Sequence, residues 1–302
     1  MKEKHFPQVL LLGNGLNRAY GGVSWGNLLK NISQRTDIPA EGLQSPMPLQ
    51  AMLYTNNNIG EAIKGKEDKL YGKIATEEQM NKLKRLLELG FDEILTTNYS
   101  YELEMAHQGT AEIKEAELKK LQLHTDAVPR TEPKYLLHTF YQMESTRIWH
   151  IHGEAKKPNG IIIDHYLYAA LLGRMIDFLK ARANYYAHCE KNEIEPEIKS
   201  WLDSFILGDV YVLGFSFEFS EFDLWWLLNR KKNENAPHGN VYFFEMEKPG
   251  FDEKKELLKL LGVIPVSCGV TKPKEGTDEA YKEFYERAIS KIEEMMSKNA
   301  PC

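Results

Sequence analysis

The sequence predicts an α/β protein with a Rossmann-like, doubly wound and mostly parallel sheet that carries helical insertions. Two observations favour this class. Short apolar runs alternate with helix-like segments along the chain, and several of these runs end in glycine or polar residues just before a helix. The 302 residues suffice for one large domain, which we expect to span residues 1–302.

The first predicted strand and its turn are the most informative stretch. Residues 9–12 are apolar, Gly13 and Gly15 follow, and a helix-like run begins near Trp25. A glycine-rich turn beneath a helix N-terminus offers backbone N–H groups and a positive dipole end to a phosphate. The G-x-G-x-x-G fingerprint is incomplete, because Arg18 stands at its third glycine. A turn that only connects strand and helix is therefore the alternative.

An insertion and a firm helix are expected next. Residues 31–75 mix prolines with polar runs, which is typical of short helices and loops inserted between strands. Thr76 and Gln79 then form a capping box, and an apolar stripe continues to Gly90, where a left-handed residue would end the helix. The helix is predicted to lie directly before the second strand.

Polar residues end the strand predicted at residues 91–99. Thr97 and Asn98 fall at its carboxyl end, before a helix that starts near Ser100. In an open α/β sheet this edge lines the ligand crevice, so both are candidate binding residues. Threonine and asparagine also commonly end strands and cap helices, which is the alternative interpretation.

Two histidines mark the next predicted strand, at residues 147–154, which follows a helix at 112–123 and a loop around Pro129 and Pro133. Its period of two places His150 and His152 on one face, with His152 last, at the carboxyl edge. Metal binding is one interpretation of this pair, although further ligands at a metal-binding spacing are missing. A histidine that is hydrogen-bonded within the core is another.

A second helical insertion is predicted at residues 165–207. Asp164 would cap a helix over residues 166–190, and Pro196 suits the first turn of a second helix. Between Asp164 and the preceding strand, residues 161–163 are expected to form a short edge strand. We expect the insertion to pack over the crevice of the sheet.

The strand predicted at residues 209–215 runs into Gly214 and Ser216, and Ser220 with Asp223 forms a capping box for the helix that follows. This turn is a second candidate site for phosphate or ribose hydroxyls.

A further strand ends at Glu245, which either faces an adenosine ribose or is solvated. A helix at 255–261, a last strand at 263–266 and an amphipathic helix at 277–298 complete the prediction.

Composition excludes several classes of partner. The net charge is −6 and the basic residues form no long cluster, so nucleic acid is not expected. No apolar run approaches 18 residues and no leader pattern is seen, which predicts a cytoplasmic protein without membrane contact. The cysteines are far apart and form no C-x-x-C pair, so neither a disulfide framework nor a thiolate zinc site is expected.

Four short blocks resemble the sirtuin-like family, in particular the bacterial sirtuin-like domains of antiphage defence systems. The blocks are GNGLN at residues 13–17, TTNY at 96–99, IHG at 151–153 and GFS at 214–216. They are spread over the whole chain. The resemblance implies a Rossmann-type fold for NAD, with a helical insertion in place of the sirtuin zinc module.

The resemblance also implies roles for single residues. His152 would be the general base, and Asn98 would position water and the nicotinamide ribose. The diphosphate and the nearby ribose would be held by the first block, through Gly13, Asn14, Gly15 and Asn17. Thr97 lies beside Asn98 at the same edge, and Gly214 and Ser216 would contact the adenosine half.

The activity that the resemblance implies is that of an NAD glycohydrolase, which releases nicotinamide and ADP-ribose from NAD as substrate without zinc. Histidine, with an unperturbed pKa of about 6.5, suits deprotonation of water at neutral pH. The family resemblance further implies a role in antiphage defence by abortive infection, a homo-oligomer and a phage-derived trigger. The missing four-cysteine module argues against an acyl-lysine deacylase.

Two alternatives stay open. Ser100 stands where the family often has an aspartate, which favours a non-catalytic regulatory module that binds NAD or ADP-ribose. The second alternative is another abortive-infection protein that processes a different nucleotide. A hydride-transfer enzyme is disfavoured by Arg18 in the fingerprint.

Overall fold

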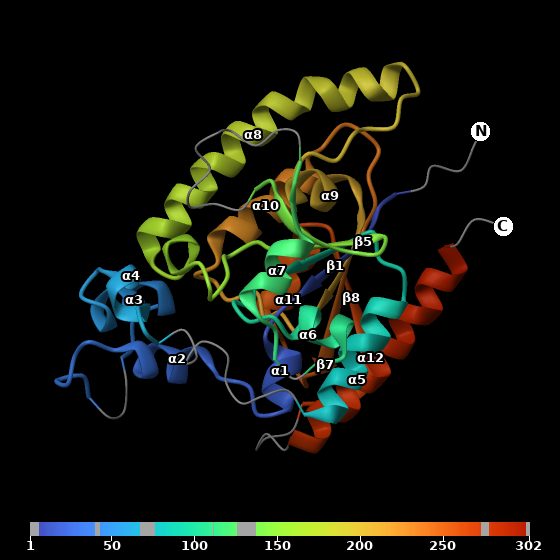
Figure 1. Ribbon diagram of the computed structural model, residues 1–302. Helices are drawn as coiled ribbons and strands as arrows, with labels where there is room; N and C mark the ends of the chain where they lie inside the picture. Colours follow the sequence, from blue (N-terminus) through green and yellow to red (C-terminus); the bar gives the residue numbers. More distant parts are fainter. Residues whose placement is uncertain are drawn as a thin grey trace.

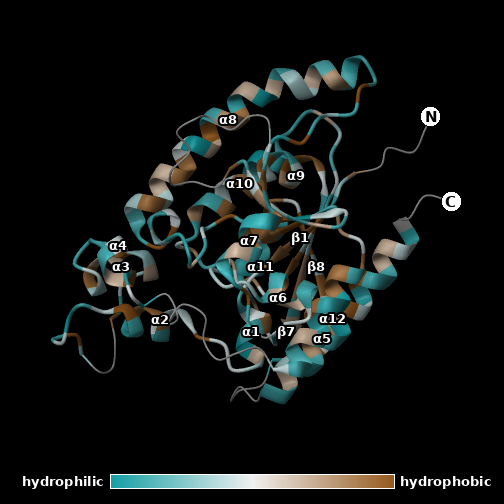
Figure 2. Ribbon diagram, viewed as in Figure 1, coloured by the Kyte–Doolittle hydropathy of each residue, from teal (hydrophilic) through white to brown (hydrophobic). Residues whose placement is uncertain are grey.

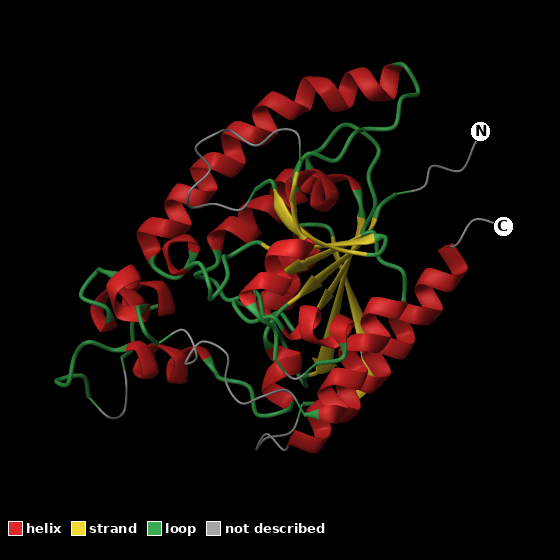
Figure 3. Cartoon of the chain, in the orientation of Figure 1, coloured by secondary structure: helices red, strands yellow, loops and turns green. Residues whose placement is uncertain are grey.

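The computed structural model describes residues 6–39, 43–66, 76–110, 112–125, 137–272 and 278–299. A twisted sheet lies at the centre, with helices on both faces (Figures 1 and 3). Its strands are β1 Gln8–Leu12, β2 Glu93–Thr96, β3 Gln122–His124, β4 Thr139–Met143, β5 Thr146–His150, β6 Asp209–Leu213, β7 Val241–Glu247 and β8 Val263–Thr271.

The sheet order is β3-β4-β5-β2-β1-β6-β7-β8. Neighbouring strands pair in parallel along the series β5, β2, β1, β6, β7 and β8, whereas β3 and β4 are antiparallel additions at one edge. The chain builds outward from β1 in one direction through β2 and in the other through β6, which is the strand order of a doubly wound Rossmann-like sheet. The predicted fold class is confirmed, and the crevice of such a sheet lies where β1 and β6 end.

The helices are α1 Gly15–Ala19, α2 Trp25–Ile32, α3 Met47–Tyr54, α4 Ile59–Ile63, α5 Glu77–Glu88, α6 Glu102–Gln108, α7 Glu115–Leu121, α8 His165–Lys191, α9 Trp201–Leu207, α10 Phe222–Lys232, α11 Glu253–Leu260 and α12 Asp278–Asn299, with a 3-10 turn η2 Pro158–Gly160. Alternating strand residues divide the core: Val9 and Leu11 pack with α8, α9 and α10, while Leu10 and Leu12 pack with α5, α6 and α12. Figure 2 shows the apolar residues concentrated on the central strands.

A third, smaller core lies beyond the carboxyl ends of the strands. Apolar residues of α2, α3 and α4 pack there against Tyr99, Ala155 and Ile161. In Figure 1 these three helices stand beside one end of α8, and α3 contacts α8. The N-terminal insertion therefore covers the edge of the sheet at which ligands bind in this fold class.

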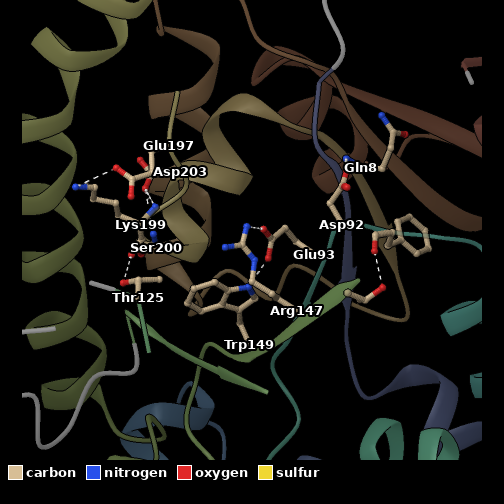
Figure 4. A network of polar contacts seen from close by, with 12 residues as sticks. Gln8, Asp92, Glu93, Thr125, Arg147, Trp149, Glu197, Lys199, Ser200 and Asp203 are labelled. Carbon is tan, nitrogen blue, oxygen red and sulfur yellow. Dashed lines mark hydrogen bonds and ion pairs between the residues drawn. The ribbon is translucent and has the colours of Figure 1, made fainter. Parts of the chain in front are cut away.

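Polar groups at the opposite, amino edge are well paired (Figure 4). The buried Glu93 carboxylate pairs with Arg147 and accepts a hydrogen bond of 2.6 Å from Trp149 Nε1. The backbone N–H of Gln8 donates to Asp92 Oδ2 over 2.8 Å. These contacts join β1, β2 and β5 at their start, so this edge has a structural role.

Several predicted elements are confirmed. Thr76 Oγ1 accepts from Gln79 N at the start of α5, and Gly90 has a φ of 77° just after that helix. Asp164 caps α8, accepting from Leu167 N over 2.8 Å.

Other boundaries differ from the prediction. Residues 161–163 are buried but form no strand, and α9 begins at Trp201 with Ser200 as its cap instead of at Pro196. The hairpin of β4 and β5 stands where only the second strand was predicted. The loop expected around residues 129–133 and the end of the first insertion, 67–75, lie outside the described residues.

Candidate functional site

A cavity lies at the carboxyl edge of the sheet, where the segments that follow β1, β2, β5 and β6 meet the start of α2. It contains four of the predicted site residues, which converge from three distant parts of the chain. The lining residues are Asn14, Val23, Ser24, Trp25, Leu28, Thr97, Asn98, Tyr99, Ser100, His152 and Glu221. The sequence therefore predicted the place of the cavity and part of its lining.

The space inside this cavity is small. Its volume is about 60 Å³, which holds water-sized groups, whereas sites for small molecules usually measure roughly 300–1,000 Å³. Trp25 at the start of α2 meets Tyr99 edge-on across it, with ring centroids 6.3 Å apart. The cavity in this conformation is therefore smaller than a nucleotide.

His152 is held in the turn after β5. Gly153 makes this turn with a φ of 91°, and a Cβ at that position would lie 2.3 Å from the carbonyl oxygen of Gly160. The imidazole is 2% exposed, and its Nε2 lies 2.9 Å from Asp223 Oδ2. Because a carboxylate can only accept, Nε2 carries the proton and Nδ1 is the nitrogen left to accept one.

Asp223 was assigned to a capping box in the sequence analysis, and that assignment is wrong. The cap residue of α10, Glu221, makes no side-chain cap, and Asp223 in the first turn of α10 instead turns its carboxylate to His152. Asp223 is fully buried, and its Oδ1 has no hydrogen-bond partner among the residues that the structure describes. His152 and Asp223 are 71 residues apart, so no local pattern could have joined them.

Asn98 presents its side chain to the cavity while its backbone is fixed. Its N–H donates to Thr96 Oγ1 over 3.1 Å, and its carbonyl oxygen lies 2.8 Å from His150 Nδ1. Within the described ranges, the carboxamide Oδ1 is buried without a hydrogen-bond partner. Buried polar atoms are nearly always paired in proteins, so this oxygen is a candidate to bind a ligand or water.

His150 and His152 do not share a face, contrary to the prediction. His150 Nε2 lies 3.0 Å from Glu104 Oε1 of α6, whereas His152 pairs with α10 on the other face of the sheet. β5 ends at His150, so the period of two no longer applies at His152. Burial lowers the pKa of His150, but the Glu104 and Glu154 carboxylates and the carbonyl oxygen of Asn98 together outweigh burial and raise it to about 9.

Glu221 is a site residue that the sequence analysis did not identify. It is 7% exposed, and its Oε2 accepts a hydrogen bond of 2.9 Å from the backbone N–H of Glu218. Burial raises its pKa to about 7, although the nearby His152 opposes this shift. An acidic residue directly after a glycine-serine turn and before a helix was the available pattern, but it was interpreted only as a helix start.

The glycine turn is not an open phosphate cradle. Gly13 N donates to Leu213 O over 2.9 Å, and Gly15 N donates to Gly214 O over 2.8 Å. A Cβ on Gly13 would lie 2.5 Å from Gly214 O, and one on Gly15 would lie 2.2 Å from the hydroxyl of Tyr285. Glycine is required here because the turns after β1 and β6 pack backbone to backbone. The phosphate-binding N–H groups expected of these two residues are therefore already used.

Three other predicted residues lie outside the cavity lining. Asn17 Oδ1 accepts from Gln79 Nε2 over 2.8 Å, which joins α1 to α5. Ser216 is exposed, and its carbonyl oxygen accepts from Lys254 Nζ. Glu245 forms an ion pair with Lys255 beside a separate hollow between β7 and α11. None of the three lines the same cavity as Asn98 and His152.

Wider searches of the described residues gave few further features. Within the described ranges, no group of three or more His, Cys, Asp or Glu side chains could hold a metal ion. None of the described helices is long and apolar enough to cross a membrane. The sequence matches no model of a known protein family and no curated protein.

Proposed function

We propose that this protein is an NAD glycohydrolase that cleaves the nicotinamide–ribose bond with water, giving ADP-ribose, nicotinamide and a proton. One observation carries the proposal. A carboxamide with an unpartnered oxygen, Asn98, and a carboxylate-paired imidazole, His152, line one cavity at the carboxyl edge of a Rossmann-like sheet. The sirtuin-like motifs supply the identity of the nucleotide, which the geometry alone does not specify.

The chemistry assigns a role to each group. Departure of nicotinamide builds positive charge on the ribose, and water attacks the anomeric carbon. His152 Nδ1 accepts the proton of that water, and the Asp223 carboxylate, 2.9 Å from Nε2, stabilises the imidazolium that forms. The Asn98 carboxamide orients the water or a ribose hydroxyl.

Because the cavity is small, we propose that the access of NAD to it is regulated. In the sirtuin-like interpretation, assembly into a homo-oligomer or a phage-derived trigger separates α2 from the loop after β2 and admits NAD. Antiphage defence by abortive infection is the biological setting that we propose. The sirtuin-like family often has an aspartate where this chain has Ser100. Ser100 lines the cavity and supplies no carboxylate, so the proposed hydrolysis has to proceed without that group.

The test is release of nicotinamide from NAD by the purified full chain, followed by chromatography. We expect His152→Ala and Asn98→Ala each to lower turnover by about 10²–10⁴-fold, the range for a positioned acid–base group. Ser297→Ala, on an exposed residue of α12 with no assigned role, is the control and should retain turnover. Turnover of both site variants at the wild-type rate would refute the assigned roles.

The small cavity and Ser100 favour one second candidate, a non-catalytic module that binds NAD or ADP-ribose. A ligand that binds only the folded state raises its apparent stability. Thermal stabilisation by NAD, with no nicotinamide released, would support this function over hydrolysis. Parallel assays with ATP and GTP would detect a protein that processes another nucleotide.

A further inference from the structure

A second, larger hollow lies between the start of α4, the turn η2 and the first turn of α8. In Figure 1, α4 stands beside this end of α8. The volume of this α4–α8 hollow is about 400 Å³, within the range of roughly 300–1,000 Å³ that is usual for small-molecule sites. Its lining residues are Asn57, Asn58, Ile59, Gly60, Asn159, Asp164, Tyr166 and Leu167. The cavity that contains Asn98 and His152 shares none of these described residues.

Three asparagine side chains form the polar wall of the hollow. Asn58 Oδ1 accepts a hydrogen bond of 3.3 Å from Glu61 N at the start of α4, which leaves its Nδ2 to bind a ligand. Asn159 Oδ1 would lie 3.0 Å from a Cβ on Gly60, so glycine leaves room for this side chain beside α4. Among the described residues, the exposed carboxamides of Asn57 and Asn159 have no hydrogen-bond partner. These amides are therefore available to donate to a ligand and to accept from it.

The lining does not call for a charged ligand. Among the described residues that line the hollow there is no lysine, arginine or histidine, and Asp164 is the one acidic residue. Asp164 Oδ1 accepts from Leu167 N over 2.8 Å at the start of the 27-residue helix α8, whose dipole stabilises the carboxylate. Asp164 therefore needs no cation from a ligand, and a phosphate would meet no positive side chain. A neutral ligand is expected.

Tyr166 supplies an aromatic surface at the edge of the same hollow. It is 70% exposed, whereas Leu167 beside it is buried in the core. An exposed aromatic ring offers a face on which a nucleobase can stack, whatever the identity of the base. The amides nearby suit the polar edge of a base, since asparagine pairs well with the donor and acceptor atoms of adenine. Ring and amides together favour a ligand with a flat, polar-edged ring.

We propose that the α4–α8 hollow binds a neutral nucleoside, with the base stacked on Tyr166 and hydrogen-bonded by the asparagine amides. The ribose hydroxyls both donate and accept hydrogen bonds, as the amides do, so the same wall serves both parts of the ligand. The hollow shares no lining residue with the cavity of the proposed NAD hydrolysis. This inference therefore does not depend on the proposed function.

The experiment measures binding of adenosine to the purified full chain by calorimetry, with AMP and D-ribose as comparison ligands. We expect one adenosine per chain, with a dissociation constant below about 1 mM. D-ribose should bind at least about tenfold more weakly, because it has no base to stack. AMP should bind no more tightly than adenosine, because the lining offers no cation to its phosphate.

Substitutions locate the bound nucleoside. Tyr166→Ala should weaken adenosine binding by roughly 10- to 100-fold, whereas Tyr166→Phe, which keeps the ring, should stay within about threefold of the wild type. Asn159→Ala should weaken binding by about two- to tenfold, through the loss of one hydrogen bond. Phe251→Ala is the matched control, because Phe251 is an aromatic residue that is 84% exposed beside the other hollow, between β7 and α11. All of these side chains are exposed, and a thermal melt confirms that each variant is folded.

The contrary outcomes are distinct. Absence of saturable adenosine binding would overturn the inference, as would wild-type affinity in both folded Tyr166→Ala and Asn159→Ala. Loss of binding in Phe251→Ala instead would place the nucleoside between β7 and α11 and would also contradict it. D-ribose that binds as tightly as adenosine would indicate a sugar site, and AMP that binds more than about tenfold more tightly would indicate a phosphate site. Either result would overturn the assignment to a neutral nucleoside.

Discussion

His150 and His152 stand two residues apart, yet their surroundings differ in one decisive respect. Both nitrogens of His150 are engaged, Nδ1 with the carbonyl oxygen of Asn98 and Nε2 with Glu104. His152 has one nitrogen engaged, with Asp223, and it lines the cavity. The first arrangement fixes a backbone segment, and the second leaves a basic atom available for chemistry. Pairing with a carboxylate alone therefore does not mark a catalytic histidine.

The largest expected difference between the two histidines is in their contribution to NAD turnover. We expect His152→Gln to lower NAD turnover by about 10²–10⁴-fold, because it removes the proton acceptor. The midpoint of thermal unfolding should fall as well, because the substitution takes the partner from the buried Asp223 carboxylate, so turnover is compared at a temperature at which both proteins are folded. A variant that hydrolyses NAD at the wild-type rate would contradict the assignment of His152.

His150→Gln should affect stability instead. The substitution leaves the buried Glu104 carboxylate without its partner, and breaking a buried pair in this way costs about 3–5 kcal/mol of unfolding free energy. Denaturant unfolding measures this cost. His107→Gln, on an exposed residue of the same helix α6, is the control and should lie within about 0.5 kcal/mol of the wild type. Equal stabilities of the two variants would show that the His150 pair is not structural.

Asp223→Asn tests whether His152 depends on its carboxylate. The amide still fills the space, but it does not stabilise an imidazolium, so turnover should fall by roughly ten- to a hundredfold. The reduced rate should still exceed that of His152→Gln. Turnover of Asp223→Asn at the wild-type rate would mean that His152 acts without Asp223.

The smallest expected effect is a pH dependence of stability. The folded-state pKa of His150 is raised to about 9, so its protonated form stabilises the fold fully below about 6.5. This stabilisation is lost as the pH rises from about 6.5 to 9, by an amount on the order of 1–3 kcal/mol. Unfolding measured at several pH values should show this slope in the wild type, and His150→Gln should lack it. Buried carboxyls remote from His150 are common to both proteins and cancel in the difference, whereas Glu102 and Glu154, whose pKa values respond to His150, contribute to it.

Local patterns predicted those parts of the fold that depend on local chemistry. The apolar run before Gly13, the Thr76 side-chain cap and the Asp164 cap each follow from neighbouring residues, and each is present. The second half of the predicted capping box is wrong, because the Gln79 side chain donates to Asn17 Oδ1 and not back to Thr76. The antiparallel pair β3 and β4 was missed because β4 gains its place by pairing with β5. Strand pairing is a property of two segments and depends strongly on context.

Sequence patterns identified single residues of the site but not the contacts between them. Asn98 and His152 each follow a strand, so the rule that ligands bind at the carboxyl edge identified both. Asp223 could not be identified, because its significance depends on a turn at Gly153 that aims His152 toward α10. Glu221 did lie in an available pattern, an acidic residue between a glycine-serine turn and a helix. A sequence pattern predicts which residues lie at the carboxyl edge of the sheet. Which side chains of distant segments pair there is seen only in the three-dimensional structure.

The contact between Gly15 and Tyr285 joins distant parts of this protein. The phenol oxygen occupies the position that any larger residue at Gly15 would need, so the final helix, α12, rests directly on the first loop of the sheet. That loop continues into Asn14, which borders the cavity. The last helix that the structure describes therefore backs the wall of the cavity, and Gly15 with Tyr285 is one of the contacts that hold the two together.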